Sequence, residues 1–353
     1  MQKQLISFRG FSFYIIVIAC FLLESCSEPV KENSGNSLKK DSVVTGTTIA
    51  DEPGANTTAI IDTVLYNKKM LQLVHDSADS KWPVKAPYPL AGAILPFNRI
   101  VAFYGNFYSK GMGILGEIPT TELIAKLQTE VQQWQLADST TPVIPAIHYI
   151  AVTAQKTPGK DGMYRLRMPF AQIDKAISLA DTISGLVFLD IQVGKSTLQA
   201  EIPRLQQYLQ MPNVHLGIDP EFSMKTGAQP GSQVGTFDAE DINFAASWLA
   251  DLVAKNKLPP KILVIHRFTQ QMVTNYKNIK TRPEVQFVID MDGFGFPAKK
   301  VNTYISRITN EPVQFSGFKL FYKNDIDPPK WKKLMEPKEI LALRPSPVYI
   351  QYQ

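Results

Sequence analysis

The feature that most constrains this chain is a regular alternation of short apolar segments and amphipathic segments from residue 99 onward. Continuous apolar runs are typical of strands buried on both faces, and apolar residues at helical spacing are typical of helices. Candidate strands occupy 99–104, 142–149, 185–191, 213–219, 261–266, 284–290, 314–322 and 347–352. Candidate helices lie between them, at 120–135, 171–181, 196–210, 238–256, 269–279 and 297–308.

This order of elements predicts an α/β fold in which helices cover a parallel sheet. Strand–helix units repeated over about 255 residues fit a (β/α)8 TIM-like barrel, whose usual length is about 250 residues. A doubly wound open α/β sheet is the alternative. The last unit is the least regular, because only a short, proline-interrupted helix candidate at 336–343 precedes the eighth strand. We therefore predict one barrel domain over 99–353.

The N-terminus predicts export and lipid anchoring. Lys3 and Arg9 precede an apolar run over 11–23, which is long enough for a signal peptide and too short to span a membrane. The run is followed by Cys26, in a setting that resembles the lipobox of bacterial lipoproteins, although Glu24 departs from that pattern. Cys20 is a less favourable lipidation site, because apolar residues follow it. An ordinary cleaved signal peptide is the alternative to a lipoprotein signal peptide over 1–25.

Two further segments precede the predicted barrel. Residues 26–60 are rich in Ser, Asn, Gly, Thr and Lys without apolar periodicity, which predicts a flexible tether. Residues 61–98 form a lead-in segment with a short helical pattern and then a proline-rich stretch. The expected location is the bacterial cell envelope, with the protein held to a membrane through its lipid anchor.

Composition excludes several classes of function. The only cysteines of the chain are Cys20 and Cys26, so the predicted barrel has no disulfide framework, cysteine-based zinc site or cysteine nucleophile. The net charge of +5 comes from 37 basic and 32 acidic residues spread along the chain, which does not favour nucleic-acid binding. We expect a monomer whose partners are the membrane and a carbohydrate or another small polar ligand.

Ionisable residues gather where the candidate strands end. In a TIM-like barrel these ends form the functional face. Residues two apart on a strand share a face, so Asp219 with Glu221, and Asp290 with Asp292, should project into the same mouth. Crowded carboxylates have pKa values that move apart, as acid–base chemistry requires. The candidate site residues are His148, Asp190, Asp219, Glu221, His266, Arg267, Asp290, Asp292, Lys319 and Tyr322.

Several sequence stretches together resemble a family of bacterial envelope lipoproteins with a TIM-barrel-like domain. These stretches are YGNFYSKGMGILGE, FLDIQVGKST, LGIDPEFSM, VIHRFT, VIDMDGFG and GFKLFYKND, and the resemblance covers roughly 99–353. The resemblance implies a barrel and an envelope location, and it carries over no reaction and no catalytic residue. The acidic residues after the fourth strand are also similar, in a general way, to those of glycoside-hydrolase barrels.

Three functions are compatible with these residues. The first is a glycan-active hydrolase with Glu221 as general acid and Asp290 or Asp292 as base or nucleophile, with Asp219 alongside them. His148, Asp190, His266, Arg267, Lys319 and Tyr322 would then bind substrate or orient the carboxylates. The second is a binding lipoprotein without catalysis. The third is a metal-dependent hydrolase of phosphoesters, with a divalent metal on His148, Asp190, Asp219 and His266. The first two need no cofactor.

Overall fold

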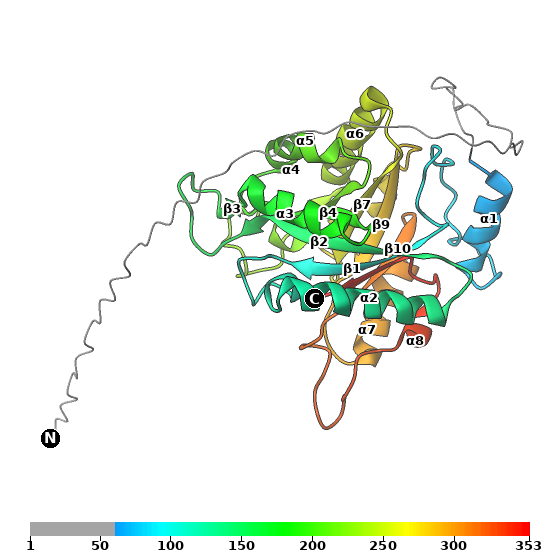
Figure 1. Ribbon diagram of the computed structural model, residues 1–353. Helices are drawn as coiled ribbons and strands as arrows, with labels where there is room; N and C mark the ends of the chain where they lie inside the picture. Colours follow the sequence, from blue (N-terminus) through cyan, green and yellow to red (C-terminus); the bar gives the residue numbers. More distant parts are fainter. Residues whose placement is uncertain (1–60) are drawn as a thin grey trace, which may run out of the picture. The chain divides into compact units, whose positions relative to one another are not determined.

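The structure is a computed structural model, and it describes residues 61–353 (Figure 1). The predicted signal peptide over 1–25, the predicted lipidation at Cys26 and the predicted tether over 26–60 lie outside the described residues. Within 61–353, no helix is both long enough and apolar enough to cross a membrane.

A closed barrel of eight parallel strands forms the centre of the described chain. Each strand pairs with its neighbours in sequence order, and β1 pairs with both β2 and β11, which closes the sheet and excludes the open-sheet alternative. The prediction of a TIM-like barrel is therefore confirmed. The barrel strands are β1 (Arg99–Gly105), β2 (Val143–Ala154), β4 (Leu186–Ile191), β5 (Val214–Ile218), β7 (Lys261–Arg267), β9 (Val285–Met291), β10 (Phe315–Leu320) and β11 (Tyr349–Tyr352). A short strand, β3 (Arg165–Arg167), runs antiparallel to β2.

Helices surround this barrel and cover its outer face (Figure 1). Most outward-facing strand residues are apolar and pack on the apolar stripes of the helices, as the sequence periodicity predicts. The helix α6 is well defined at its start, where Asp238 and Asp241 form a capping box. The helices are α2 (Thr120–Ala137), α3 (Phe170–Asp181), α4 (Leu198–Glu201), α5 (Gln206–Leu209), α6 (Ala239–Asn256), α7 (Pro297–Tyr304) and α8 (Pro337–Leu341). Shorter helical turns occupy 114–116, 202–205, 220–222, 276–278 and 305–309.

One predicted helix is wrong. The segment 269–279 contains the two-residue strand β8 (Val273–Thr274), paired with β6 (Phe237–Asp238), and a single turn of 3-10 helix. The cause lies in the buried Arg267, whose guanidinium donates hydrogen bonds to the carbonyls of Thr269, Gln270 and Val273. These carbonyls would accept backbone N–H groups in a helix, so the arginine holds the segment as a loop.

The lead-in segment closes the N-terminal end of the barrel. Its helix α1 (Thr63–Gln72) confirms the short helical pattern, and it packs with Leu95 against the first residues of the strands. The carboxamide oxygen of Gln286 accepts hydrogen bonds from the backbone N–H groups of Ile94 and Leu95, and its Nε2 donates to the carbonyl of Leu95. The segment is therefore part of the folded body and belongs to the same compact unit as the barrel.

The barrel interior has two halves of different chemistry. The lower half, near the N-terminal ends of the strands, contains apolar side chains such as Ile100, Leu186, Ile262 and Phe315. The upper half, near the C-terminal ends, contains ionisable and polar side chains that are almost fully buried: Tyr104, His148, Asp190, Asp219, His266, Asp290, Asp292, Lys319 and Gln351.

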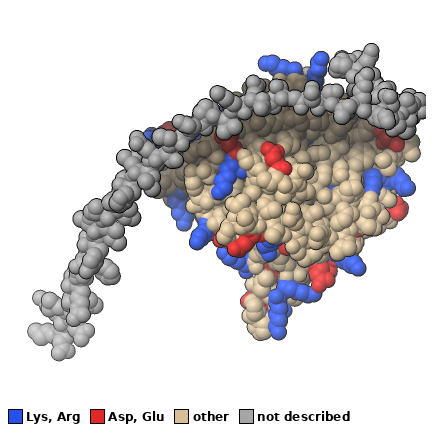
Figure 2. All heavy atoms as spheres, in the orientation of Figure 1, with Lys and Arg blue, Asp and Glu red and all other residues tan. Residues whose placement is uncertain are grey.

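Charged residues are interspersed on the outer surface that Figure 2 draws. Lysine and arginine side chains alternate with acidic ones, and most of this face carries neither. The charge on this face does not form the basic stripe that tracks a phosphate backbone.

Candidate functional site

A pocket of about 620 Å³ opens at the C-terminal end of the barrel. This is the end at which TIM barrels carry their active sites. Four of the residues selected from the sequence line the pocket, namely Asp219, Glu221, Asp292 and Lys319. Aromatic side chains complete the lining, among them Tyr104, Phe222, Phe268, Phe294 and Phe321. The pocket therefore combines carboxyl groups, one buried ammonium group and aromatic rings.

Glu221 is placed by a tight turn that follows β5. The strand ends at Ile218, and Asp219 begins a 3-10 turn by accepting a hydrogen bond from the backbone N–H of Glu221, at 3.0 Å. Burial raises the pKa of Glu221 to about 7, and the negative charge of Asp292 acts in the same direction, whereas Lys319 and His266 oppose it. Glu221 can therefore hold a proton near neutral pH.

Asp219 lies just inside Glu221 and is more deeply buried. Its second carboxylate oxygen accepts a hydrogen bond from Gln192 Nε2 at 3.3 Å. Burial raises the pKa of Asp219 well above its usual range, and the neighbouring Glu221, Asp190 and Asp292 add to that effect while His266 opposes it. Asp219 and Glu221 both line the pocket, although β5 ends at Ile218 and Glu221 lies in the turn that follows it.

Asp292 has the opposite electrostatic setting. One of its oxygens lies 2.9 Å from Lys319 Nζ, and the other lies 3.1 Å from His266 Nδ1. Burial alone would raise the pKa of Asp292, but the Lys319 ammonium and His266 outweigh burial and lower it. Lys319 also lies 3.8 Å from the centre of the Tyr104 ring. Asp292 is therefore a fixed carboxylate within the same pocket as a protonatable Glu221.

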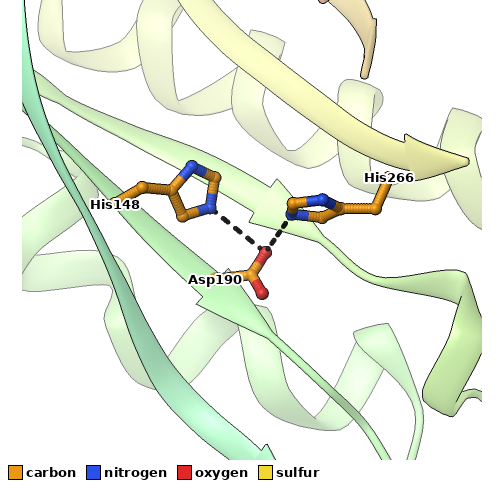
Figure 3. Close-up of side chains that lie close together, drawn as sticks. All are labelled: His148, Asp190 and His266. Atoms are coloured by element: carbon orange, nitrogen blue, oxygen red, sulfur yellow. Dashed lines mark ion pairs between the residues drawn. The ribbon is translucent and has the colours of Figure 1, made fainter. Parts of the chain in front are cut away.

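Beneath the pocket, three side chains from different strands meet inside the barrel (Figure 3). Asp190 Oδ1 lies 3.3 Å from His148 Nε2 and 3.3 Å from His266 Nε2. We call these three residues the interior cluster. All three are fully buried, and none of them lines the pocket. Tyr104 lines the pocket and donates its hydroxyl to Asp190 Oδ2 at 3.1 Å, so this ring separates the interior cluster from the pocket.

The two histidines of the interior cluster differ in charge preference. Burial lowers the pKa of His148 to about 4, which outweighs the attraction of Asp190 for a protonated ring. Burial also disfavours a charged His266, but Asp190 and Asp292 together raise the pKa of His266 well above its usual range. The predicted role of His148, Asp190 and His266 in direct substrate binding is therefore corrected, because a molecule in the pocket does not reach these buried side chains.

Two glycines make room for the buried polar groups. Gly217 on β5 pairs in register with Asp190, and a Cβ atom there would lie 2.4 Å from His148 Nε2 and 2.5 Å from Asp190 Oδ1. Gly317 on β10 pairs with Asp290, and a Cβ atom there would lie 2.6 Å from Asp290 Oδ1. Any larger residue at either position would displace the carboxylate beside it.

Asp290 is not in a catalytic position. It is fully buried, it does not line the pocket, and neither of its carboxylate oxygens has a hydrogen-bond partner among the described residues. Burial raises the pKa of Asp290 to about 7, with His266 opposing and Asp292 supporting that shift. Of the two residues proposed as base or nucleophile, only Asp292 can touch a molecule in the pocket.

Two site predictions are wrong, because the side chains point away from the barrel interior. Arg267 pairs with Glu311 on the outer side of the barrel, where it also contacts the carbonyl of Arg307. Tyr322 donates its hydroxyl to Glu130 of α2 and stacks on Tyr352. Neither residue lines the pocket.

The site includes residues that the sequence analysis did not select. Tyr104 covers the interior cluster, and Gln192 links Tyr104 to Asp219 through its carboxamide. Gln192 could have been found from the sequence, because it lies two positions after Asp190 and therefore shares its inward face. Gly217 could not be recognised as a site residue from the sequence, because it has no functional group and contributes only the space that a larger side chain would fill.

The interior cluster is the one group of His, Cys, Asp and Glu side chains within 61–353 that could hold a metal ion. Asp219, predicted as a fourth metal ligand, does not belong to this group. An ion on the interior cluster would also be separated from the pocket by Tyr104. These positions do not support a phosphoester hydrolase in which a metal-bound water attacks a molecule in the pocket.

Comparisons with known proteins leave the family open. No protein-family model matches the chain, and no curated protein matches its sequence. Among solved structures, the chain is similar to the C-terminal domain of ChiA from Legionella pneumophila, with 12% identity and a TM-score of 0.26. The similarity covers 68% of this chain and 62% of that one, so the chain spans less than two thirds of its neighbour. A likeness this distant carries no argument about activity.

Proposed function

We propose that this protein hydrolyses glycosidic bonds at the mouth of its barrel, with Glu221 as general acid and Asp292 as base or nucleophile. The observation that carries the proposal is that two carboxyl groups of different setting line one pocket. Glu221 is half-buried and has no ion-pair partner among the described residues, whereas Asp292 is paired with Lys319. Glycosidases of the common type need one protonated and one ionised carboxyl group on either side of the bond.

The rest of the pocket supports a carbohydrate ligand. Phe294 and Phe321 pack edge to face, and Phe294 remains about half exposed at the pocket rim. Aromatic faces accept the apolar faces of sugar rings, while Gln192, Asn324 and Lys299 in the lining offer hydrogen-bonding groups to hydroxyls. Glu221, whose pKa is near 7, would donate its proton to the departing oxygen.

The test is hydrolysis by the full-length protein of chitin oligosaccharides, xylo-oligosaccharides and solubilised peptidoglycan, followed by release of reducing ends. On a cleaved substrate, Glu221→Gln should lower the rate about 10²–10⁴-fold, the usual contribution of a general acid. The loss should be smaller on a matched 2,4-dinitrophenyl glycoside, because that leaving group departs without a proton. The rate should also fall as the pH rises through about 7, as Glu221 loses its proton.

The control is Glu240→Gln, the same chemical change at an exposed position in the first turn of α6. It should leave the rate unchanged. Parental turnover by Glu221→Gln would remove Glu221 from the mechanism.

A binding protein without catalysis is the second candidate, and one observation favours it. Both oxygens of Asp292 are already engaged, by Lys319 and His266, as in a carboxylate that serves to shape a binding pocket. Saturable binding of one of the same oligosaccharides, with no turnover by the parent protein under any pH tested, would select this function.

We also propose that the protein is attached to a membrane of the bacterial envelope through lipid on Cys26. This proposal depends on the sequence alone, namely the short apolar run and the cysteine that follows it. Partitioning of the full-length protein into the detergent phase should be lost in Cys26→Ser and kept in the control Cys20→Ser. Loss in the control alone would move the anchor to Cys20.

A further inference from the structure

The interior cluster contains polar atoms that have no hydrogen-bond partner. His148 Nε2, His266 Nε2 and Asp190 Oδ1 are all buried, and none of them makes a hydrogen bond of acceptable geometry among the described residues. The three atoms nevertheless face one another, with both nitrogens 3.3 Å from the same oxygen (Figure 3). Buried polar atoms are rarely left without partners, because an unsatisfied buried donor or acceptor has lost its hydration and gained no hydrogen bond in return.

The remaining polar atoms of the same three side chains each lie against a second polar group. His266 Nδ1 lies 3.1 Å from Asp292 Oδ2, and His148 Nδ1 lies 2.5 Å from the hydroxyl of Tyr349. Asp190 Oδ2 accepts the hydroxyl of Tyr104. Each side chain therefore contacts a second polar group with the atom that points away from the other two side chains. Outer contacts of this kind, above all a carboxylate on the second nitrogen of a histidine, orient metal-binding side chains.

We propose that His148 Nε2, Asp190 Oδ1 and His266 Nε2 bind a divalent metal ion, of the zinc type, inside the barrel. Two imidazole nitrogens and one carboxylate oxygen form a donor set that zinc accepts. The two nitrogen–oxygen separations also fit, because 3.3 Å is the edge of a tetrahedron whose corners lie about 2.0 Å from its centre, the length of a zinc–nitrogen bond, and all three ligand atoms lie within 4.8 Å of one another. The absence of a side chain at Gly217 leaves this space open.

The ion would be a structural and positioning element, and it would not touch a molecule in the pocket. It joins β2, β4 and β7, whose side chains provide the three ligand atoms. It also fixes the His266 ring, whose Nδ1 lies 3.1 Å from Oδ2 of Asp292, the carboxylate that lines the pocket. Because the ligands are fully buried, we expect the ion to enter during folding and to exchange slowly afterwards.

The test is metal analysis of the full-length protein, purified without chelator, unfolded in guanidinium chloride, refolded in the presence of excess zinc chloride and desalted. We expect about one zinc per chain, the stoichiometry of a single three-ligand site. Asp190→Asn, which keeps the shape of the side chain, and His148→Ala should each lose the ion. His75→Ala should retain it, because His75 is an exposed histidine whose ring contacts the carbonyl of Leu343.

A second measurement keeps the proposal falsifiable if the variants fail to fold. A chelator should leave the zinc in place in the folded parent protein and remove it after unfolding in guanidinium chloride, and the metal-free protein should refold to a lower Tm. Zinc below one tenth of an equivalent in the parent protein would overturn the proposal. Zinc retained by both His148→Ala and Asp190→Asn would also overturn it. None of these outcomes depends on glycan hydrolysis, so the two proposals fail separately.

Discussion

The lower and upper halves of the barrel interior are built on the same eight strands, yet they differ in what they contain. The lower half is mostly apolar, with the buried Gln286 as a polar exception, and is closed by Leu95 and the lead-in segment. The upper half contains buried charges, two glycines that leave space and a pocket that opens outward. Burial of apolar surface stabilises a fold, whereas buried charges cost free energy unless they are paired. The lower half therefore supplies the stability that permits the upper half to hold a site.

The largest expected effect of a single change on stability lies in the lower half. Leu95→Ala removes a fully buried side chain from the closed end of the barrel and should lower the free energy of unfolding by about 2–5 kcal/mol. Leu90→Ala, at an exposed position of the same segment, should change it by less than about 0.5 kcal/mol. Chemical denaturation measures both. Equal values for the two variants would show that the lead-in segment does not stabilise the barrel.

An intermediate effect is expected from filling the space in the upper half. Gly217→Ala places a Cβ atom within 2.5 Å of the interior cluster and should cost about 1–3 kcal/mol, the range for overpacking. Gly111→Ala is the control, because the nearest atom to its Cβ would be 3.9 Å away. If Gly217→Ala is as stable as the parent protein, the interior cluster can accommodate a methyl group at this position, which would contradict the short distances.

The smallest effect is the dependence of stability on pH. A carboxyl group whose pKa rises from 4.5 to about 7 on folding binds its proton more tightly in the folded state. Its contribution therefore destabilises the fold progressively as the pH rises from about 5 to about 8. At 1.4 kcal/mol per pKa unit the upper bound on this loss is about 3.5 kcal/mol, and solvent screening of this half-buried side chain reduces the loss well below that bound.

Glu221→Gln removes the titrating group and should lose less stability than the parent protein over the same range. Denaturant titrations at pH 5 and pH 8 make the measurement, with Glu240→Gln as the exposed control. If the free energy of unfolding changes equally between pH 5 and pH 8 in the parent protein and in Glu221→Gln, the pKa of Glu221 does not rise on folding.

The barrel strands were predictable from the sequence because each buried strand is a continuous apolar run. The inward direction of Asp219, His266 and Asp292 followed from their positions near the strand ends together with the alternation of side chains. The same alternation, applied to the next residue, places Arg267 on the face opposite His266. It also places Tyr322, two residues beyond the end of β10, on the face opposite Lys319. These two wrong predictions came from grouping residues by proximity in sequence without separating the two faces.

Other features depend on contacts that are distant in sequence. The loop over 269–279 has helical periodicity, and it departs from a helix because Arg267 binds its carbonyls. The distinction between the pocket and the interior cluster depends on Tyr104, a residue of the first strand that covers Asp190 of another strand. No local pattern indicates which strand-end residues reach the pocket and which remain beneath it.

The closure of the sheet between β1 and β11 has a consequence for how the protein folds. The contact between His148 and Tyr349 joins residues separated by 201 positions, and the pairing of β1 with β11 joins the two ends of the barrel. Contacts of such large sequence separation form late and slowly, because the chain entropy of a long loop must be lost first. A synthesising ribosome must therefore release the chain through β11 before the sheet can close, and closure of the sheet would report a late step of folding.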